Sequence, residues 1–252
     1  MDNETKEKLK NLFEGVDSNL NVTDPEWVDI IANFSWNETV RESKLTEKEQ
    51  MLCILSALLG CQGMGEFQNM FNAALNMGID PIALKEVIYQ ATAYLGIGRI
   101  YDFLIAVNQI IEQHGIKLPL APQATVNEET RFEDGLTKQV EFFGPNMKKQ
   151  QTDAPVLRRN INRWLADNCF GDYYTRNGLN DQEREMITFC FILAQGGCEN
   201  QLRGHTAGNL GVGNDKEKLY SVVEQCMPYI GYPRSLNAMN IIDEVAKTME
   251  SQ

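Results

Sequence analysis

Two stretches of the chain are apolar over most of their length and carry helix signals at both ends. Residues 46–60 and 181–197 each open with an acidic turn behind a capping residue, Thr46 or Asn180, and each ends at glycine. These signals are typical of α-helices. Because apolar residues fill most of the circumference, we expect both helices to be buried against several neighbours, either within one chain or in an oligomer.

Two further stretches repeat this design. Residues 81–96 follow Asp80, residues 215–231 follow Asn214, and both stretches end at glycine. Asp and Asn are common N-caps, and glycine is the commonest residue just beyond a helix. His114, which precedes a glycine, is expected to end another helix. No part of the chain shows sustained alternation of apolar and polar residues between turn signals, so the sequence predicts an all-α fold.

The chain contains an internal duplication. Shifting the sequence by 135 positions pairs residues 51–99 with residues 186–234 without a gap, and eleven of the paired positions are identical. An adjustment of one residue near Leu45 and Leu179 extends the match upstream. The identical pairs include Gln90/Gln225, Tyr94/Tyr229 and Arg99/Arg234. The predicted fold is therefore a tandem duplication of one helical unit.

The boundary between the two copies is predicted from a polar connector. Residues 117–131 hold two prolines and a polar stretch, a composition typical of an exposed crossing. We place the boundary near Pro122, which gives a first copy of residues 1–121 and a second copy of residues 122–252.

Composition and charge restrict the partners. With 43% apolar and 23% charged residues, the sequence is typical of a soluble globular protein. The formal net charge of -12 disfavours nucleic acid and anionic membranes. The first residues lack the apolar core of a signal peptide, and no apolar run is long enough to span a membrane, so a cytoplasmic protein is expected.

The six cysteines form no Cys-x-x-Cys pair and no metal-ligand spacing with either histidine. We therefore expect reduced thiols that are mostly buried, no metal site and no other cofactor.

Three segments of the second copy carry a family resemblance. Residues 199–213 (ENQLRGHTAGNLGVG) and 229–245 (YIGYPRSLNAMNIIDEV) resemble the carboxymuconolactone decarboxylase family, whose members have a similar helical His, an Asn/Gly-rich turn and a later Tyr-x-Gly-x-Pro-x-x-x-Asn-Ala stretch. Residues 169–189 resemble the segment that enters the family's first core helix, with Glu185 inside that helix. The resemblance covers nearly the whole chain as a tandem pair.

The resemblance implies an all-helical fold that assembles as hexamers of single units or as trimers of tandem ones. A homotrimer of tandem chains, pseudo-hexameric in form, is therefore expected. It also implies carboxy-lyase activity on a small cyclic carboxylic acid or lactone.

His205 is the candidate general acid/base for such a reaction. Decarboxylation needs a proton source for the carbanion that remains, and histidine has the side-chain pKa nearest neutral pH. Glu185 would orient the imidazole, although it could equally complement the start of its own helix. Arg234 would hold a substrate carboxylate, although its match with Arg99 also fits a structural role.

The remaining candidate residues lie on the helix that holds His205. If this helix begins just after Gly197, then Cys198, Gln201, His205 and Asn209 share one face. Gln201 and Asn209 would then orient the imidazole or bind substrate. Arg203 would point elsewhere, toward a subunit contact or a neighbouring site.

Two alternatives remain open at this stage. The family includes the alkyl hydroperoxide reductase D type, which uses Cys-x-x-Cys-x-x-x-His. Here Cys198 lies seven residues before His205, but Gln201 stands where the second cysteine would be, so a peroxidase of peroxiredoxin type would need another thiol. The second alternative is a non-catalytic ligand-binding or scaffold protein, because the first copy has Met70 in place of His205 and looks degenerate.

Overall fold

The computed structural model describes residues 3–15 and 19–251, and in this part of the chain every regular element is a helix. The first copy comprises α1 (Asn3–Leu12), α2 (Leu20–Thr23), α3 (Pro25–Asn33), the π-helical η1 (Phe34–Glu38), α4 (Glu47–Cys61), α5 (Met64–Asn76), α6 (Pro81–Leu95) and α7 (Ile97–Gln113). The second copy comprises α8 (Arg131–Phe143), α9 (Asn146–Asp153), the 3-10 turn η2 (Val156–Arg158), α10 (Arg159–Trp164), the π-helical η3 (Leu165–Tyr174), α11 (Asp181–Gln195), α12 (Glu199–Gly211), α13 (Lys216–Ile230) and α14 (Tyr232–Glu250). The all-α prediction is confirmed.

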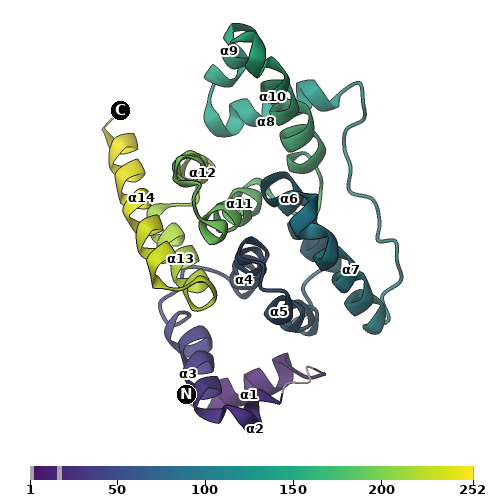
Figure 1. The fold of residues 1–252 in the computed structure, drawn as a ribbon, viewed down its shortest axis with the longest axis vertical. Helices are drawn as coiled ribbons and strands as arrows, with labels where there is room; N and C mark the ends of the chain where they lie inside the picture. Colours follow the sequence, from purple (N-terminus) through teal and green to yellow (C-terminus); the bar gives the residue numbers. More distant parts are fainter. Residues whose placement is uncertain (1–2, 16–18, 252) are drawn as a thin grey trace.

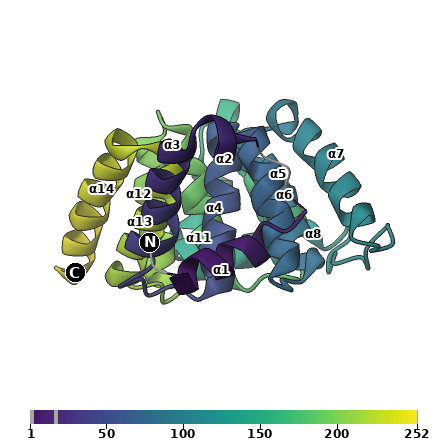
Figure 2. The same ribbon diagram turned by 90° about the horizontal axis from the view of Figure 1, so that it is seen from below.

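Helices α4 and α11 form the centre of the molecule, with α13 and α14 on one side and α6 and α7 on the other (Figures 1 and 2). They approach closely at Gly60, where a Cβ atom would lie 2.6 Å from Ala194 Cβ and 2.8 Å from the Phe191 carbonyl oxygen. Nearly every residue of the two helices after the first turn is buried. Of the two explanations for their apolar surface, the structure therefore supports burial within one chain.

The helix starts follow the sequence signals, with one correction. Thr46 and Asn180 each form a capping box with the glutamate three residues later, and Asp80 accepts a hydrogen bond from the Ile82 amide. Helix α13, however, is capped by Asp215 and not by Asn214. The Asn214 amide instead donates to the Asn209 side chain and to the Gln182 carbonyl, because it lies buried against α11 and α12.

The duplication holds, but its register changes once. Helices α4 and α11 begin 134 residues apart, whereas α5 and α12 begin 135 apart. The extra residue lies in the turn of residues 196–198, which precedes α12. The identical pairs Met51/Met186 and Leu58/Leu193 are therefore not structural equivalents, and the counterpart of Glu185 is Met51.

The molecule is elongated, with α8 to α10 at one end and α1 to α3 at the other (Figure 1). Its accessible surface is 13258 Å², against about 11,300 Å² for a typical folded monomer of this mass. The connector between α7 and α8 is irregular and contains Pro122, where the boundary between the copies stays a prediction. Of the described helices, none combines the length and the apolar character needed to cross a membrane.

Candidate functional site

The imidazole of His205, on α12, pairs with the carboxylate of Glu185, on α11. His205 Nδ1 lies 2.9 Å from Glu185 Oε2; the Glu185 side chain is fully buried and that of His205 is 13% exposed. The rings of Tyr94 and Phe143 contact the imidazole with near-perpendicular planes, at centroid distances of 5.4 and 5.5 Å. The ring is thus held by one carboxylate and enclosed by two aromatic side chains.

Gly208 makes room for this pair. A Cβ atom at this position would lie 2.5 Å from Glu185 Oε2 and 2.9 Å from Phe143 Cε1. Both distances are shorter than a non-bonded contact with carbon allows. A glycine three residues after His205 is therefore needed for the carboxylate to reach the imidazole.

Hydroxyl groups converge on the other oxygen of the carboxylate. Tyr174 OH donates to Glu185 Oε1 at 2.8 Å, and it also lies 2.8 Å from Thr188 Oγ1 and 2.9 Å from Tyr94 OH. Since Tyr174 has one hydroxyl proton and gives it to the carboxylate, Thr188 and Tyr94 must donate to the Tyr174 oxygen. Every proton of this cluster is therefore oriented toward Glu185.

These hydroxyl groups stay neutral. Burial raises the pKa of Tyr94 and of Tyr174 well above the usual value for a phenol, and the negative charge of Glu185 adds to the effect. Burial also raises the pKa of Cys169, whose thiol lies 3.7 Å from Tyr94 OH, to about 12. All three groups therefore act as hydrogen-bond donors and not as acids at neutral pH.

This arrangement fixes the roles of the two imidazole nitrogens. Glu185 Oε1 is occupied by Tyr174, so an ionised Glu185 accepts the Nδ1 proton on its other oxygen. The Nε2 atom has no hydrogen-bond partner among the described residues. A neutral His205 thus presents the Nε2 lone pair, and a protonated one presents an Nε2 proton, to any ligand beside Tyr94 and Phe143.

Asn209 joins the two helices of the pair. Its amide donates to the carbonyl oxygens of His205, at 2.7 Å, and of Glu185, at 3.0 Å, and its own oxygen accepts from Asn214. Asn209 is fully buried, so it positions the backbone of both residues and does not face a ligand.

Gln201 and Arg203 lie apart from this cluster. Gln201 is exposed on α12. The Arg203 guanidinium binds the Glu244 carboxylate on α14 through hydrogen bonds of 3.0 to 3.2 Å. The Arg203 guanidinium is thus engaged with α14 and not with the imidazole of its own chain.

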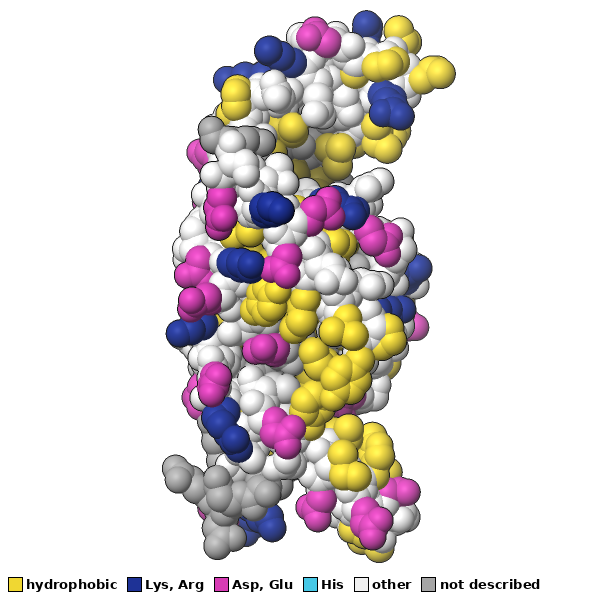
Figure 3. Space-filling model, turned by 90° about the vertical axis from the view of Figure 1, so that its left-hand side faces the viewer, with side chains coloured by type: hydrophobic (Ala, Val, Ile, Leu, Met, Phe, Trp, Pro, Cys, Tyr) yellow, Lys and Arg dark blue, Asp and Glu magenta, His cyan; other side chains and the backbone are white. Residues whose placement is uncertain are grey.

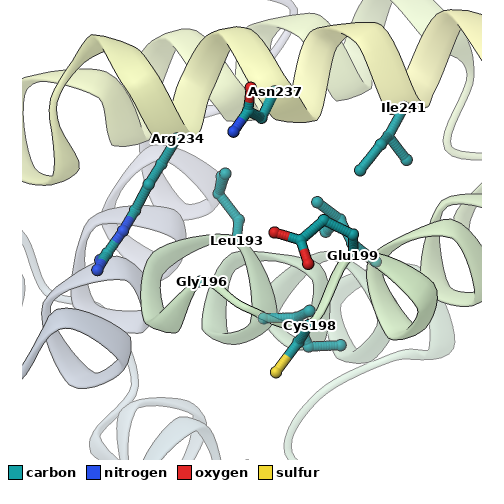
Figure 4. Close-up of a pocket in the computed structure, with 9 residues that line it drawn as sticks. Leu193, Gly196, Cys198, Glu199, Arg234, Asn237 and Ile241 are labelled. Atoms are coloured by element: carbon teal, nitrogen blue, oxygen red, sulfur yellow. The ribbon is translucent and has the colours of Figure 1, made fainter.

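Cys198 and Arg234 share a separate small pocket between the start of α12 and α14 (Figure 4). Its volume, about 30 Å³, corresponds to one water molecule. The Glu199 carboxylate is directed into the space between the helices, whereas Cys198 Sγ points away from α14 (Figure 4). The Arg234 guanidinium donates to the Ala194 carbonyl, near the end of α11. As built in one chain, this pocket is too small for a lactone acid.

The first copy contributes residues that sequence reasoning missed. Tyr94 comes from α6, and so does Gln90, whose amide donates to Thr188 Oγ1 at 2.8 Å and accepts from the Arg184 guanidinium at 2.7 Å. Both belong to pairs that are identical in the two copies, Gln90/Gln225 and Tyr94/Tyr229, and that identity was the available signal. The site of the second copy is therefore built across the contact between the copies.

The corresponding positions of the first copy are apolar. Met51, Ile54 and Met70, all buried, stand where the second copy has Glu185, Thr188 and His205. Among the residues that the structure describes, the two polar atoms of the buried Gln225 side chain are consequently left without a hydrogen-bond partner. Paired acid/base groups of this kind are thus found in the second copy and not at the equivalent positions of the first.

Other chemistry is limited. All six cysteines are free thiols. Within residues 3–15 and 19–251, His, Cys, Asp and Glu side chains form no group of three or more that could hold a metal ion.

Comparison with known proteins identifies the family. The model of the carboxymuconolactone decarboxylase family matches residues 25–109 and again residues 160–244. The chain belongs to the carboxymuconolactone decarboxylase family. The two matches also agree with the duplicated helical unit seen in the structure.

Two known proteins resemble this chain, one in sequence and one in structure. A 125-residue segment is 26% identical to a 4-carboxymuconolactone decarboxylase of Acinetobacter baylyi, covering 49% of this chain and 92% of that protein. A crystal structure of a Burkholderia xenovorans protein, provisionally named as a gamma-carboxymuconolactone decarboxylase subunit, matches with a TM-score of 0.54 and 18% identity over 97% of both chains. The second comparison supports the fold along the whole chain.

Proposed function

We propose that this protein is a carboxy-lyase that acts on a small cyclic carboxylic acid or lactone, with His205 as general acid/base. The observation that carries the proposal is the buried Glu185 bound to Nδ1 of His205, which leaves Nε2 free between two aromatic rings. The relative from Acinetobacter, named as a decarboxylase of such an acid, supports the substrate class.

The proposed reaction breaks the bond between the carboxylate carbon and the ring. Carbon dioxide leaves, and the electron pair of that bond moves into the conjugated carbonyl system of the ring as a dienolate. Nε2 of a protonated His205 then gives its proton to the ring carbon, and solvent restores the proton afterwards. Glu185 stabilises the imidazolium, while Tyr94 and Phe143 supply an apolar surface beside a carboxylate that loses its charge.

Substrate binding is proposed to involve a neighbouring chain. Arg203 and Arg234 are engaged with Glu244 and with the end of α11, so neither is free beside its own His205. In an assembly, Arg203, whose side chain is 40% exposed, could exchange Glu244 for a carboxylate at a neighbouring site.

Assembly as a homotrimer of tandem chains is part of the proposal. Large apolar side chains are exposed at equivalent positions of both copies, as in the pairs Trp27/Ile161, Ile30/Trp164, Ile97/Tyr232 and Tyr101/Leu236. Figure 3 shows hydrophobic side chains gathered at both ends and over the middle of one face. Surface of this extent is typical of contacts with other chains.

Opposite charges at the two ends favour a head-to-tail contact. The exposed apolar residues of α3 are accompanied by Asp24, Glu26 and Asp29. Those of α10 are accompanied by Arg158, Arg159 and Arg163. A contact between unlike ends generates a ring when the rotation closes, which suits a cyclic trimer.

Six free thiols favour a cytoplasmic location.

The test is carbon dioxide release from 4-carboxymuconolactone by the purified protein, measured beside His205→Gln and Cys198→Ser. Release that survives Cys198→Ser and collapses in His205→Gln supports the acid/base proposal. Hydroperoxide reduction that is lost in Cys198→Ser would favour a thiol peroxidase instead. Neither activity, together with stabilisation of the fold by a small acid, would favour a ligand-binding protein.

A further inference from the structure

A second cavity lies where the connector between the copies crosses α6, away from His205. Its volume is about 90 Å³, the space of roughly three water molecules. Its walls come from both copies: Lys85, Glu86 and Tyr89 from α6, Pro119 and Pro122 from the connector, and Arg176 from the loop before α11. The loop and the connector are fixed to each other, because the Asn177 amide donates to the Gln123 carbonyl at 3.0 Å.

Lys85 brings a buried positive charge to this cavity. The residue is 8% exposed, and its ammonium donates to the Asn108 side chain at 2.9 Å. Among the described residues, no carboxylate lies within 4.0 Å of the Lys85 ammonium. A buried ammonium usually has a counter-charge, because removing it from water is costly. An anion in the cavity would supply that charge and accept one of the two remaining ammonium protons.

Arg176 brings a second positive charge. Its Nε and one terminal nitrogen bind the Glu86 carboxylate at 2.9 to 3.0 Å, and the side chain is 18% exposed. Glu86 also binds the Arg184 guanidinium at 3.2 Å. One carboxylate thus faces two guanidinium groups, and the Lys85 ammonium belongs to a residue that lines the same cavity. This region of an otherwise acidic protein therefore carries an excess of positive charge.

The two cations share one aromatic ring, and apolar side chains form part of the remaining wall. The Lys85 ammonium lies 5.5 Å from the centroid of the Tyr89 ring, and the Arg176 guanidinium lies 5.2 Å from it. Pro119 and Pro122 extend the apolar surface. Such a lining suits an anion with a short hydrocarbon tail better than a fully hydrated inorganic one.

We propose that this cavity binds the carboxylate of a short-chain organic acid of about three to four carbon atoms, the size that its volume admits. The carboxylate lies beside Lys85 and Arg176, and the tail lies against Tyr89 and the prolines of the connector. The site is distinct from that of the proposed decarboxylation, because Arg184, Gln90, Thr188, Tyr174 and Glu185 separate Glu86 from His205 in the hydrogen-bond network. The proposal therefore does not depend on the function of His205.

The test is a ligand-observed NMR titration of butyrate, with inorganic phosphate as the comparison anion. Butyrate is expected to bind more tightly than phosphate, and Lys85→Gln is expected to weaken butyrate binding at least tenfold by removing the charge while retaining a donor for Asn108. Lys117→Gln removes an exposed charge nearby in the connector and is the matched control, with an unchanged affinity expected.

A second variant keeps the proposal testable if Lys85→Gln does not fold. Ala121 is exposed and lines the cavity, so Ala121→Phe narrows the cavity without disturbing the core, and it should abolish butyrate binding while the melting temperature stays unchanged. Absence of butyrate binding to the wild type, equal affinity for phosphate, or an affinity that neither Lys85→Gln nor Ala121→Phe lowers would overturn the proposal.

Discussion

Two glycines on α12 give a matched test of the site geometry. Gly204 and Gly208 lie one turn apart, and replacing either by alanine should favour the helix by about 0.8–1.0 kcal/mol. A Cβ atom at Gly204 would meet nothing within 4 Å, so Gly204→Ala should stabilise the protein by about that amount. A Cβ atom at Gly208 would meet Glu185 Oε2 at 2.5 Å.

Gly208→Ala must therefore displace a buried carboxylate. Overpacking of a core typically costs 1–3 kcal/mol, and weakening a hydrogen bond to a charged group costs about 1.5–3 kcal/mol. Together these two costs amount to about 2.5–6 kcal/mol, so after the gain in helix propensity the expected net destabilisation is about 1.5–5 kcal/mol. The two variants should therefore differ by about 2.5–6 kcal/mol in the free energy of unfolding. Urea denaturation followed by circular dichroism measures this difference. Equal stabilisation by both alanines would refute the position of Glu185 described here.

Three further predictions concern polar side chains that are buried or partly buried. Gln90→Met should destabilise the protein by about 1–3 kcal/mol, because it removes one of the acceptors of the Arg184 guanidinium and the amide that donates to Thr188. Gln225→Met should be neutral or stabilising, because the Gln225 side chain has no hydrogen-bond partner among the described residues. Thermal denaturation compares the two variants, and an equal loss of stability would contradict this difference. For the proposed decarboxylation, Glu185→Gln should lower kcat about 10²–10⁴-fold, and an unchanged kcat would exclude a role for this carboxylate. Burial acts to raise the pKa of Glu49, but hydrogen bonds from Lys218 and from the cap of α4 outweigh it and lower that pKa. The stability that Glu49 contributes is therefore present above its unfolded pKa and is lost as the pH falls through its pKa in the folded protein. Glu49→Gln should consequently lower the free energy of unfolding at pH 7 and change it little near pH 2.

The fold was largely predictable because its signals are local. The capping residues Thr46, Asn180 and Asp80 start helices as expected, and the apolar stretches behind them are buried. The predicted register of the duplication was wrong over α4 and α11, because the turn before α12 holds one extra residue. Chance identities between the two copies hid this shift in the sequence alignment. Asn214 was mistaken for a cap because the sequence cannot tell which of two adjacent polar residues faces the interior.

The site was predictable only in part, because most of it depends on tertiary contacts. The sequence pointed to His205 and Glu185, and in the structure these two side chains lie within hydrogen-bond distance. Tyr94 and Gln90 reach the site from the other copy, and Tyr174 reaches it from a π-helical segment, so no spacing along one helix relates them to His205. The partners of Arg203 and Arg234 are likewise set by α14 and α11 and not by their own neighbours in the chain.

The proposed role of His205 requires that Glu185 keeps the imidazole proton on Nδ1 and leaves Nε2 free for proton transfer. The tautomer can be read from a long-range 15N–1H NMR correlation spectrum, recorded at a pH at which both imidazoles are neutral. The chain has only two histidines, so the spectrum holds only two imidazole signals to assign. His114, whose Nε2 lies 2.7 Å from the Asn72 side chain at the surface, serves as the internal reference. The Nδ1-protonated tautomer is expected for His205, because Glu185 accepts that proton. The Nε2-protonated tautomer at His205 would contradict it.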